Sequence, residues 1–108
     1  MKNNQEIMNS IKTAKAEKIA EYDATIRSLL SYETERMAAD ACLTGHIECP
    51  IKDEKHVSDF GFEDLLEKSI PEKTFRELAK RQLKELGFRA IHYRAVEGKN
   101  VMFFRCRG

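Results

Sequence analysis

Residues 71–107 read PEKTFRELAKRQLKELGFRAIHYRAVEGKNVMFFRCR, and this stretch decides the fold. Its first half has apolar residues at steps of three and four, the spacing of one helix face: Phe75, Leu78, Ala79, Leu83 and Leu86. Ser69 and Glu72 have the spacing of a capping box. Gly87 suits the left-handed position of a Schellman motif, which brings Phe88 back to Leu83. We therefore predict a helix that begins near Ser69 and ends before Gly87.

The second half of this stretch has the pattern of a β-hairpin. Gly98 and Lys99 separate two runs rich in aromatic and β-branched residues, and glycine at the first central position suits a type II′ turn. A turn there sets these pairs opposite one another on an apolar face, which we interpret as the core face: Ala95 with Met102, Tyr93 with Phe104, and Ile91 with Cys106. We expect the other face to lie in solvent, with His92, Arg94, Phe103, Arg105 and Arg107.

Residues 4–41 contain no proline or glycine and are rich in helix-forming residues, so we predict one long helix. At about 1.5 Å per residue it spans about 60 Å, more than the width of a domain of this size. An apolar stripe follows its middle: Ile19, Tyr22, Ile26 and Leu29. The helix breaks within residues 25–32, or the stripe pairs with a second copy, or the stripe packs on the domain's own sheet. We favour self-association through the stripe and expect a homo-oligomer.

The segment after this helix has the pattern of a short strand. Gly45 ends the helix, and Ile47, Cys49 and Ile51 alternate with less apolar neighbours. Pro50 has no N–H to give to another strand, so we place this strand at a sheet edge. A short helix is predicted further along, from Phe60, Phe62, Leu65 and Leu66.

The expected order of elements is helix, strand, helix, helix, strand, strand. This order predicts an α+β fold in which helices cover one face of a small three-stranded sheet of antiparallel type. We divide the chain into a long helical arm, residues 1–45, and a compact strand–helix–helix–hairpin part, residues 46–108. Both belong to one structural domain, because 108 residues support a single modest core.

Composition favours a globular protein of the cytoplasm. No apolar run has the length of a signal peptide or a membrane span, and three cysteines cannot all pair, which fits a reducing compartment and no membrane partner. The net charge of +1 conceals an asymmetry. Residues 1–72 hold 9 Lys/Arg and 15 Asp/Glu (−6), and residues 73–108 hold 10 and 3 (+7). A basic part of this kind fits a polyanion or the acidic part of another copy.

The residues that could carry catalysis or bind a metal form no recognised motif. Cys42, His46 and Cys49 lie within eight residues, yet there is no Cys-x-x-Cys pair, so the zinc signal is weak. No spacing sets a cysteine beside a histidine, and no glycine-rich loop follows a strand. We therefore expect a protein that is not an enzyme, with no catalytic residues, no metal and no cofactor.

Positive charge in the last third predicts a surface for nucleic acid or another polyanion. We assign it to Lys80, Lys84, Arg89, His92, Arg94, Phe103, Arg105 and Arg107, with Phe103 able to stack on a base. Over residues 46–107 the order of elements also resembles a winged helix. This resemblance implies that the helix before the hairpin enters the major groove and that the hairpin is the wing.

The chain as a whole resembles the small accessory proteins encoded by phages and prophages of low-GC bacteria. The features that carry the resemblance are the lysine- and glutamate-rich helix, the short strand after Gly45, the LKELGF segment at residues 83–88 and the final hairpin. The resemblance implies a small non-enzymatic protein that occupies a host or phage partner. This is our leading interpretation, and a winged-helix-like nucleic-acid-binding protein is the alternative.

Overall fold

The computed structural model describes residues 1–50 and 70–107, and it confirms the α+β fold. The elements are α1 (Asn4–Ala39), β1 (Thr44–Glu48), α4 (Glu72–Glu85), β2 (Arg89–Val96) and β3 (Lys99–Arg105). The short helix predicted over residues 60–66 and the strand position of Ile51 lie outside the described residues. Helix α4 begins at Glu72 with Pro71 as its N-cap residue, so the predicted start near Ser69 with a capping box to Glu72 is wrong.

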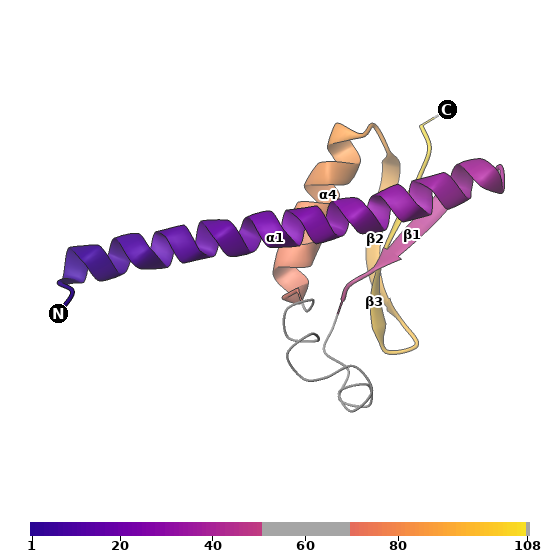
Figure 1. The fold of residues 1–108 in the computed structure, drawn as a ribbon. Helices are drawn as coiled ribbons and strands as arrows, with labels where there is room; N and C mark the ends of the chain where they lie inside the picture. Colours follow the sequence, from indigo (N-terminus) through magenta and orange to yellow (C-terminus); the bar gives the residue numbers. More distant parts are fainter. Residues whose placement is uncertain (51–69, 108) are drawn as a thin grey trace, which may run out of the picture.

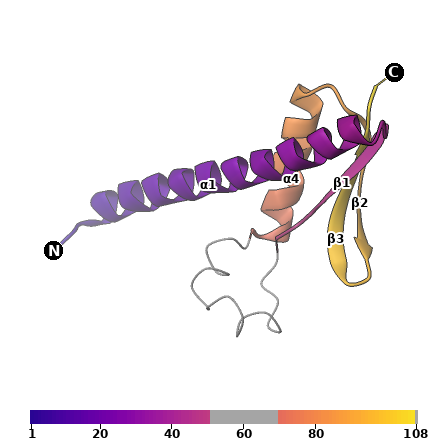
Figure 2. The same cartoon turned by 45° about the vertical axis from the view of Figure 1, so that its right-hand side comes forward.

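The three strands form one antiparallel sheet in the order β1-β3-β2, so β1 is an edge strand, as Pro50 predicted. Both helices contribute to a core on one face of this sheet, which we call the inner face. Helix α1 contributes Ile26, Leu30 and Met37, and α4 contributes Phe75, Ala79 and Leu83. The strands contribute Ile47, Met102 and Phe104. In Figures 1 and 2, α1 crosses α4 and reaches β1 at its C-terminal end. The core thus draws on both predicted parts of the chain.

Helix α1 is continuous over its 36 residues, without the break considered for residues 25–32. It begins where the Asn3 side chain accepts a hydrogen bond from the Glu6 N–H at 2.9 Å. It ends before Gly45, because Ala41 takes a left-handed conformation (φ 51°) and the Cys42 N–H donates to the Met37 carbonyl at 2.8 Å. The prediction that Gly45 ends the helix is therefore wrong.

Gly45 instead belongs to β1, where its missing side chain leaves room for the core. A Cβ atom at this position would stand 2.9 Å from the Phe104 ring and 2.5 Å from the Met37 sulfur. Glycine is required here by space, since α1 and β3 both approach the strand closely.

Helix α4 ends as the sequence predicts. Gly87 has a φ of 87°, the Phe88 N–H donates to the Leu83 carbonyl at 3.0 Å, and the Gly87 N–H donates to the Lys84 carbonyl at 3.0 Å. These two bonds define a Schellman motif. Phe88 then packs its ring edge-on against Phe104, with 4.9 Å between centroids, and this contact turns the chain onto the sheet.

The hairpin register differs from the prediction by two residues. Val96 is opposite Lys99, so the turn residues are Glu97 and Gly98, with φ angles of 51° and 79°. Two positive φ angles define a type I′ turn, in which glycine takes the second central position. The predicted type II′ turn at Gly98 and Lys99 is therefore wrong.

A slip of two residues leaves the side chains of the regular pairs, residues 92–96 and 99–103, on their predicted faces, because side chains alternate with a period of two. Tyr93 lies opposite Met102 instead of Phe104. The Tyr93 and Phe104 rings still point to the inner face. Near its start β2 has an irregularity between Arg89 and His92, where two residues oppose one on β3. Cys106, predicted to face inward, follows the end of β3 and is exposed.

The observed faces predict unequal losses of stability when neighbouring phenylalanines are truncated. Phe104 is 2% exposed, so Phe104→Ala is expected to lower the free energy of unfolding by roughly 3–5 kcal/mol. Phe103 is half-buried on the other face, and Phe103→Ala is expected to cost less than about half as much. Urea unfolding of both variants measures the difference, and equal losses would contradict the observed faces.

Candidate binding surfaces

An ion pair on α1 bonds to backbone groups at the outer edge of β1. The Glu33 carboxylate accepts a hydrogen bond from the His46 N–H at 2.8 Å, and the Arg36 guanidinium donates to the Thr44 carbonyl at 3.4 Å. Glu33 and Arg36 also bond to each other. Two outward backbone groups of β1, the His46 N–H and the Thr44 carbonyl, thus have side-chain partners on α1, which hinders pairing of another chain at this edge.

Glu33 is charged where it lies. Burial favours its protonated form, but the Arg36 guanidinium and the His46 N–H outweigh burial and hold the pKa of this carboxyl below its usual value. The lowered pKa means that the folded state binds a proton here less readily than the unfolded chain does. The contribution of Glu33 to stability is therefore present above its unfolded pKa, and it decreases as the pH falls through the folded-state pKa.

The face of the sheet away from the helices, which we call the outer face, is built around Phe103. The Arg94 guanidinium lies 4.7 Å from the Phe103 ring centre, and the His46 ring lies 5.8 Å from it. His92 is opposite Phe103 on β2. A depression of about 360 Å³ is lined partly by His46, His92, Phe103 and Arg105. The outer face therefore combines an aromatic ring with cationic side chains, a combination that suits anionic or aromatic ligands.

A second basic surface lies on α4. Lys73, Lys80 and Lys84 are separated by seven and four residues, so they share one side of the helix, and all are exposed. We call this set the basic row. Because α4 packs on the inner face, the sheet stands between the basic row and Arg94, Phe103 and Arg105. The structure thus divides the predicted polyanion site into two surfaces, with Arg89 and Arg107 exposed near the strand ends.

A groove runs between α4 and β2. Its volume is about 230 Å³ and it is lined by Arg76 and Lys80 of α4, Ile91 and Tyr93 of β2 and Met102 of β3. The Arg76 guanidinium lies 4.5 Å from the Tyr93 ring centre. The Tyr93 hydroxyl is buried without a hydrogen-bond partner among the described residues, and its burial, with Cys49 and Glu72 nearby, raises the pKa of Tyr93 to about 12. We call this site the β2 groove.

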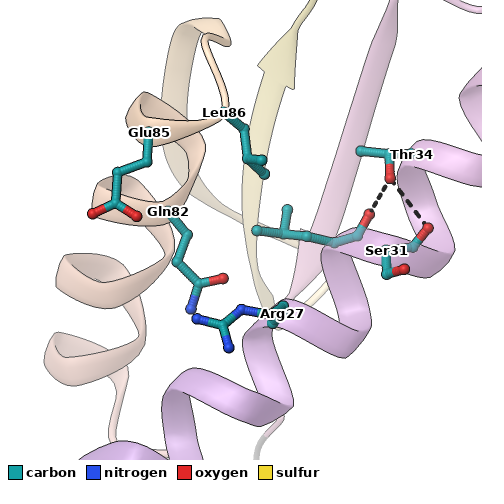
Figure 3. A pocket seen from close by; sticks show the side chains of 7 residues that line it. Arg27, Ser31, Thr34, Gln82, Glu85 and Leu86 are labelled. Carbon is teal, nitrogen blue, oxygen red and sulfur yellow. Dashed lines mark hydrogen bonds between the residues drawn. The ribbon is translucent and has the colours of Figure 1, made fainter.

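A third hollow, of about 310 Å³, lies between α1 and α4 (Figure 3). Arg27 of α1 and Gln82 of α4 point toward one another across it, and Leu86 closes one end. Beside it, Asp23 joins the helices: Arg81 donates to its carboxylate at 2.8 Å, and the buried Gln82 amide donates to its carboxylate and its carbonyl at 3.0 Å each. The lining offers one carboxylate, Glu85, and no histidine or cysteine, so no acid–base pair is formed there.

The cysteines and histidines are placed differently from one another. Cys49 is buried on the inner face and His46 is exposed on the outer face, so these two cannot share a metal ion. Cys42 and His46, which sequence spacing grouped, do line one depression, together with His92. The Cys42 sulfur hydrogen-bonds to Thr44, which lowers the pKa of the thiol, and no described histidine bonds to it. Across residues 1–50 and 70–107, no three potential ligands gather as a metal site requires.

The stripe predicted for self-association is mostly inside the molecule. Ile26 is fully buried in the core, and Tyr22 and Leu29 pack against it. Ile19 is exposed, as are Ile7, Met8 and Ile11 further toward the N-terminus. In Figures 1 and 2 this first part of α1 projects past α4 and the sheet, and we call residues 4–19 the overhang.

Glu33, Arg36 and Asp23 are the structural residues that sequence reasoning missed. Each is a charged residue in a lysine- and glutamate-rich helix, where charge usually marks the solvent side. Their one sequence signal is position: Glu33 follows Ile26 by seven residues and so falls on the apolar side of α1.

Comparison with protein-family models, with curated proteins and with solved structures found no match. Within the described part of the chain, neither helix combines the length and the apolar character needed to cross a membrane.

The edge contact predicts a pH-dependent loss of stability when Glu33 is changed. Glu33→Ala leaves the His46 N–H without its acceptor, and we expect it to cost about 1–3 kcal/mol of unfolding free energy at pH 7. Glu33→Gln retains an oxygen acceptor and is expected to cost less. The gap in unfolding free energy between wild type and either variant should narrow as the pH falls through the lowered folded-state pKa of Glu33, where the wild-type carboxylate takes up a proton. Urea unfolding across pH measures it, and a gap that does not vary with pH would contradict the charged state of Glu33.

Proposed function

We propose that this protein acts by binding rather than by catalysis, and that two copies pair through the overhang of α1. One observation carries the proposal: four large apolar side chains of the overhang, Ile7, Met8, Ile11 and Ile19, are each 43–46% exposed. Apolar side chains gathered on an exposed face are typical of a partner surface.

The overhang continues the side of α1 that enters the core. Ile11 precedes Ile19 by eight residues, and Ile19 precedes Ile26 by seven, so each step is about two helical turns. The three side chains therefore lie on one side of α1. Ile26 is covered by the chain's own core, whereas Ile11 and Ile19 are exposed. A second helix laid along the overhang would extend this packing.

Changing Ile11 to glutamate tests this pairing without disturbing the core. Ile11→Glu is expected to weaken the dimer roughly 10- to 100-fold, because a charge in an apolar contact costs about 1–3 kcal/mol. Thr13→Glu adds the same charge on the opposite side of the helix and serves as the matched control. Multi-angle light scattering gives the mass, and circular dichroism shows that helix content is unchanged.

Two results would count against the pairing. A wild type that is monomeric at high micromolar concentration removes it, and so does an equal effect of Ile11→Glu and Thr13→Glu. Ile26→Glu distinguishes pairing from folding, because Ile26 is fully buried in its own core and a charge there is expected to unfold the monomer.

We further propose that the protein works in the cytoplasm as an accessory factor of the phage or prophage kind, occupying a host or phage partner. The resemblance in layout supports the class, and three free cysteines, Cys42, Cys49 and Cys106, support a reducing compartment.

Nucleic-acid binding is a second candidate, favoured by the two basic surfaces. The basic row of α4 and the Arg94–Phe103–Arg105 group of the outer face each present cations, and the latter adds a ring for stacking. The sheet order and the helix before the hairpin are also compatible with the winged-helix arrangement.

Fluorescence anisotropy with single- and double-stranded oligonucleotides across a salt series tests this candidate. If it is correct, affinity falls steeply with salt. Lys80→Ala with Lys84→Ala is expected to weaken duplex binding several-fold if α4 makes the contact, and Arg94→Ala with Arg105→Ala to weaken single-strand binding if the outer face does. No binding at low salt would eliminate nucleic acid as the partner.

A further inference from the structure

The two edges of the sheet differ in the hydrogen-bond partners of their outward backbone groups. At β1, Glu33 accepts a hydrogen bond from the outward His46 N–H and Arg36 donates one to the outward Thr44 carbonyl. At β2, the described residues provide no strand or side chain that bonds to the outward backbone groups. Unpaired edges of this kind can accept a further strand, and natural sheets usually block them.

The pairing pattern identifies which backbone groups of β2 have no partner among the described residues. The Cys49 N–H donates to the Asn100 carbonyl at 2.8 Å, so residues of β3 with even numbers bond toward β1. Residues of β3 with odd numbers therefore bond toward β2, where they pair with His92, Arg94 and Val96. The N–H and C=O groups of Tyr93 and Ala95 consequently point to the free edge. The irregularity between Arg89 and His92 limits the regular free edge to residues 92–96.

Basic side chains stand beside this edge on both faces, with Glu72 as an acidic group near Tyr93. On the inner side the β2 groove presents Arg76 and Lys80, and on the outer side Arg94 lies over Phe103. A second copy of β2 is disfavoured as the occupant, because antiparallel pairing about Tyr93 would bring Arg94 close to His92 and Arg94 of the other strand. An incoming strand with carboxylates at alternate positions would instead meet opposite charge.

We infer that the free edge of β2 binds an extended acidic segment of a partner protein, which adds to the sheet as a fourth strand beside Arg76 and Lys80. The Tyr93 and Ala95 backbone groups give the hydrogen bonds of the new ladder, and the alternation of the strand sends one set of its side chains toward the β2 groove. This inference names a partner class for the proposed binding function, but it does not depend on pairing through the overhang.

The test uses the full-length protein and a fluorescein-labelled seven-residue peptide that alternates glutamate and valine. The matched probe is the same peptide N-methylated on alternate residues, which keeps the charge and removes the N–H groups of one edge; both methylation phases are made. The inference predicts micromolar binding of the parent peptide and at least a tenfold loss for the phase that blocks the edge facing β2. Hydrogen exchange of the Tyr93 and Ala95 amides should slow on peptide binding.

Protein variants separate the backbone contribution from charge. Ala95→Pro removes the edge N–H without removing a bond to β3 and is expected to weaken the peptide at least tenfold, whereas Ala95→Ser keeps the N–H and is expected to leave affinity within about twofold. Arg76→Ala with Lys80→Ala is expected to weaken binding at least tenfold. Lys84→Ala removes a charge from the same helix outside the β2 groove and is the matched control. Circular dichroism confirms that each variant is folded.

Several results would overturn the inference. The first is equal binding of the parent peptide and both methylated peptides. The second is a loss of affinity for Lys84→Ala as large as the loss for the double variant Arg76→Ala with Lys80→Ala. The third is no peptide binding at low salt. If an oligonucleotide binds through Arg76 and Lys80 and the peptide does not bind, the site is a nucleic-acid site instead. The peptide is also titrated into Ile11→Glu, because loss of pairing with unchanged peptide affinity separates this inference from the proposed dimer.

Discussion

The fold depends on how one long helix meets the edge of a small sheet. A three-stranded sheet has two edges, and each edge strand leaves half of its backbone groups without partners. Helix α1 covers part of the β1 edge, because Glu33 accepts from the His46 N–H and Arg36 donates to the Thr44 carbonyl. The same helix buries apolar residues against the inner face. The same helix therefore supplies core packing and edge hydrogen bonds, and its position fixes β1 beside β3.

The packing of α1 on the sheet also determines how much of the helix has no neighbour in the described chain. The helix is 36 residues long, and its buried residues run from Ile26 to Met37, so the sheet and α4 use its second half. The first half keeps the apolar side of the same helix without a neighbour in the described chain. The maximum extent of 58 Å against 35 and 22 Å reflects this projection. Burial of the second half thus leaves the overhang as the surface available for a partner.

The sequence predicted the features that depend on local chemistry. The Schellman stop at Gly87, the edge position predicted from Pro50 and the faces of the regular hairpin pairs need only neighbouring residues, and the structure confirms them. It did not predict the turn, because Glu97 accepts a positive φ that its residue type does not favour. Glu33 and Asp23 were missed because their partners lie 13 and 59 residues away, and no local pattern marks such pairs. The predicted polyanion site was divided for the same reason, since only the packing of α4 decides which side of the sheet each lysine occupies.

Some charges of the basic last third form ion pairs with the acidic part of the chain. Arg81 pairs with Asp23 at 2.8 Å and Lys99 with Glu48 at 3.6 Å, and both pairs join the basic last third to the acidic part before it. Arg81 lies on the side of α4 that meets α1, so internal pairing accounts for that side. Arg76 and Lys80 lie on the side that meets β2, where the strand edge has no described partner. Positive charge and unpaired backbone thus occur at the same place, and a partner that supplies only charge or only a strand would leave one of them unsatisfied.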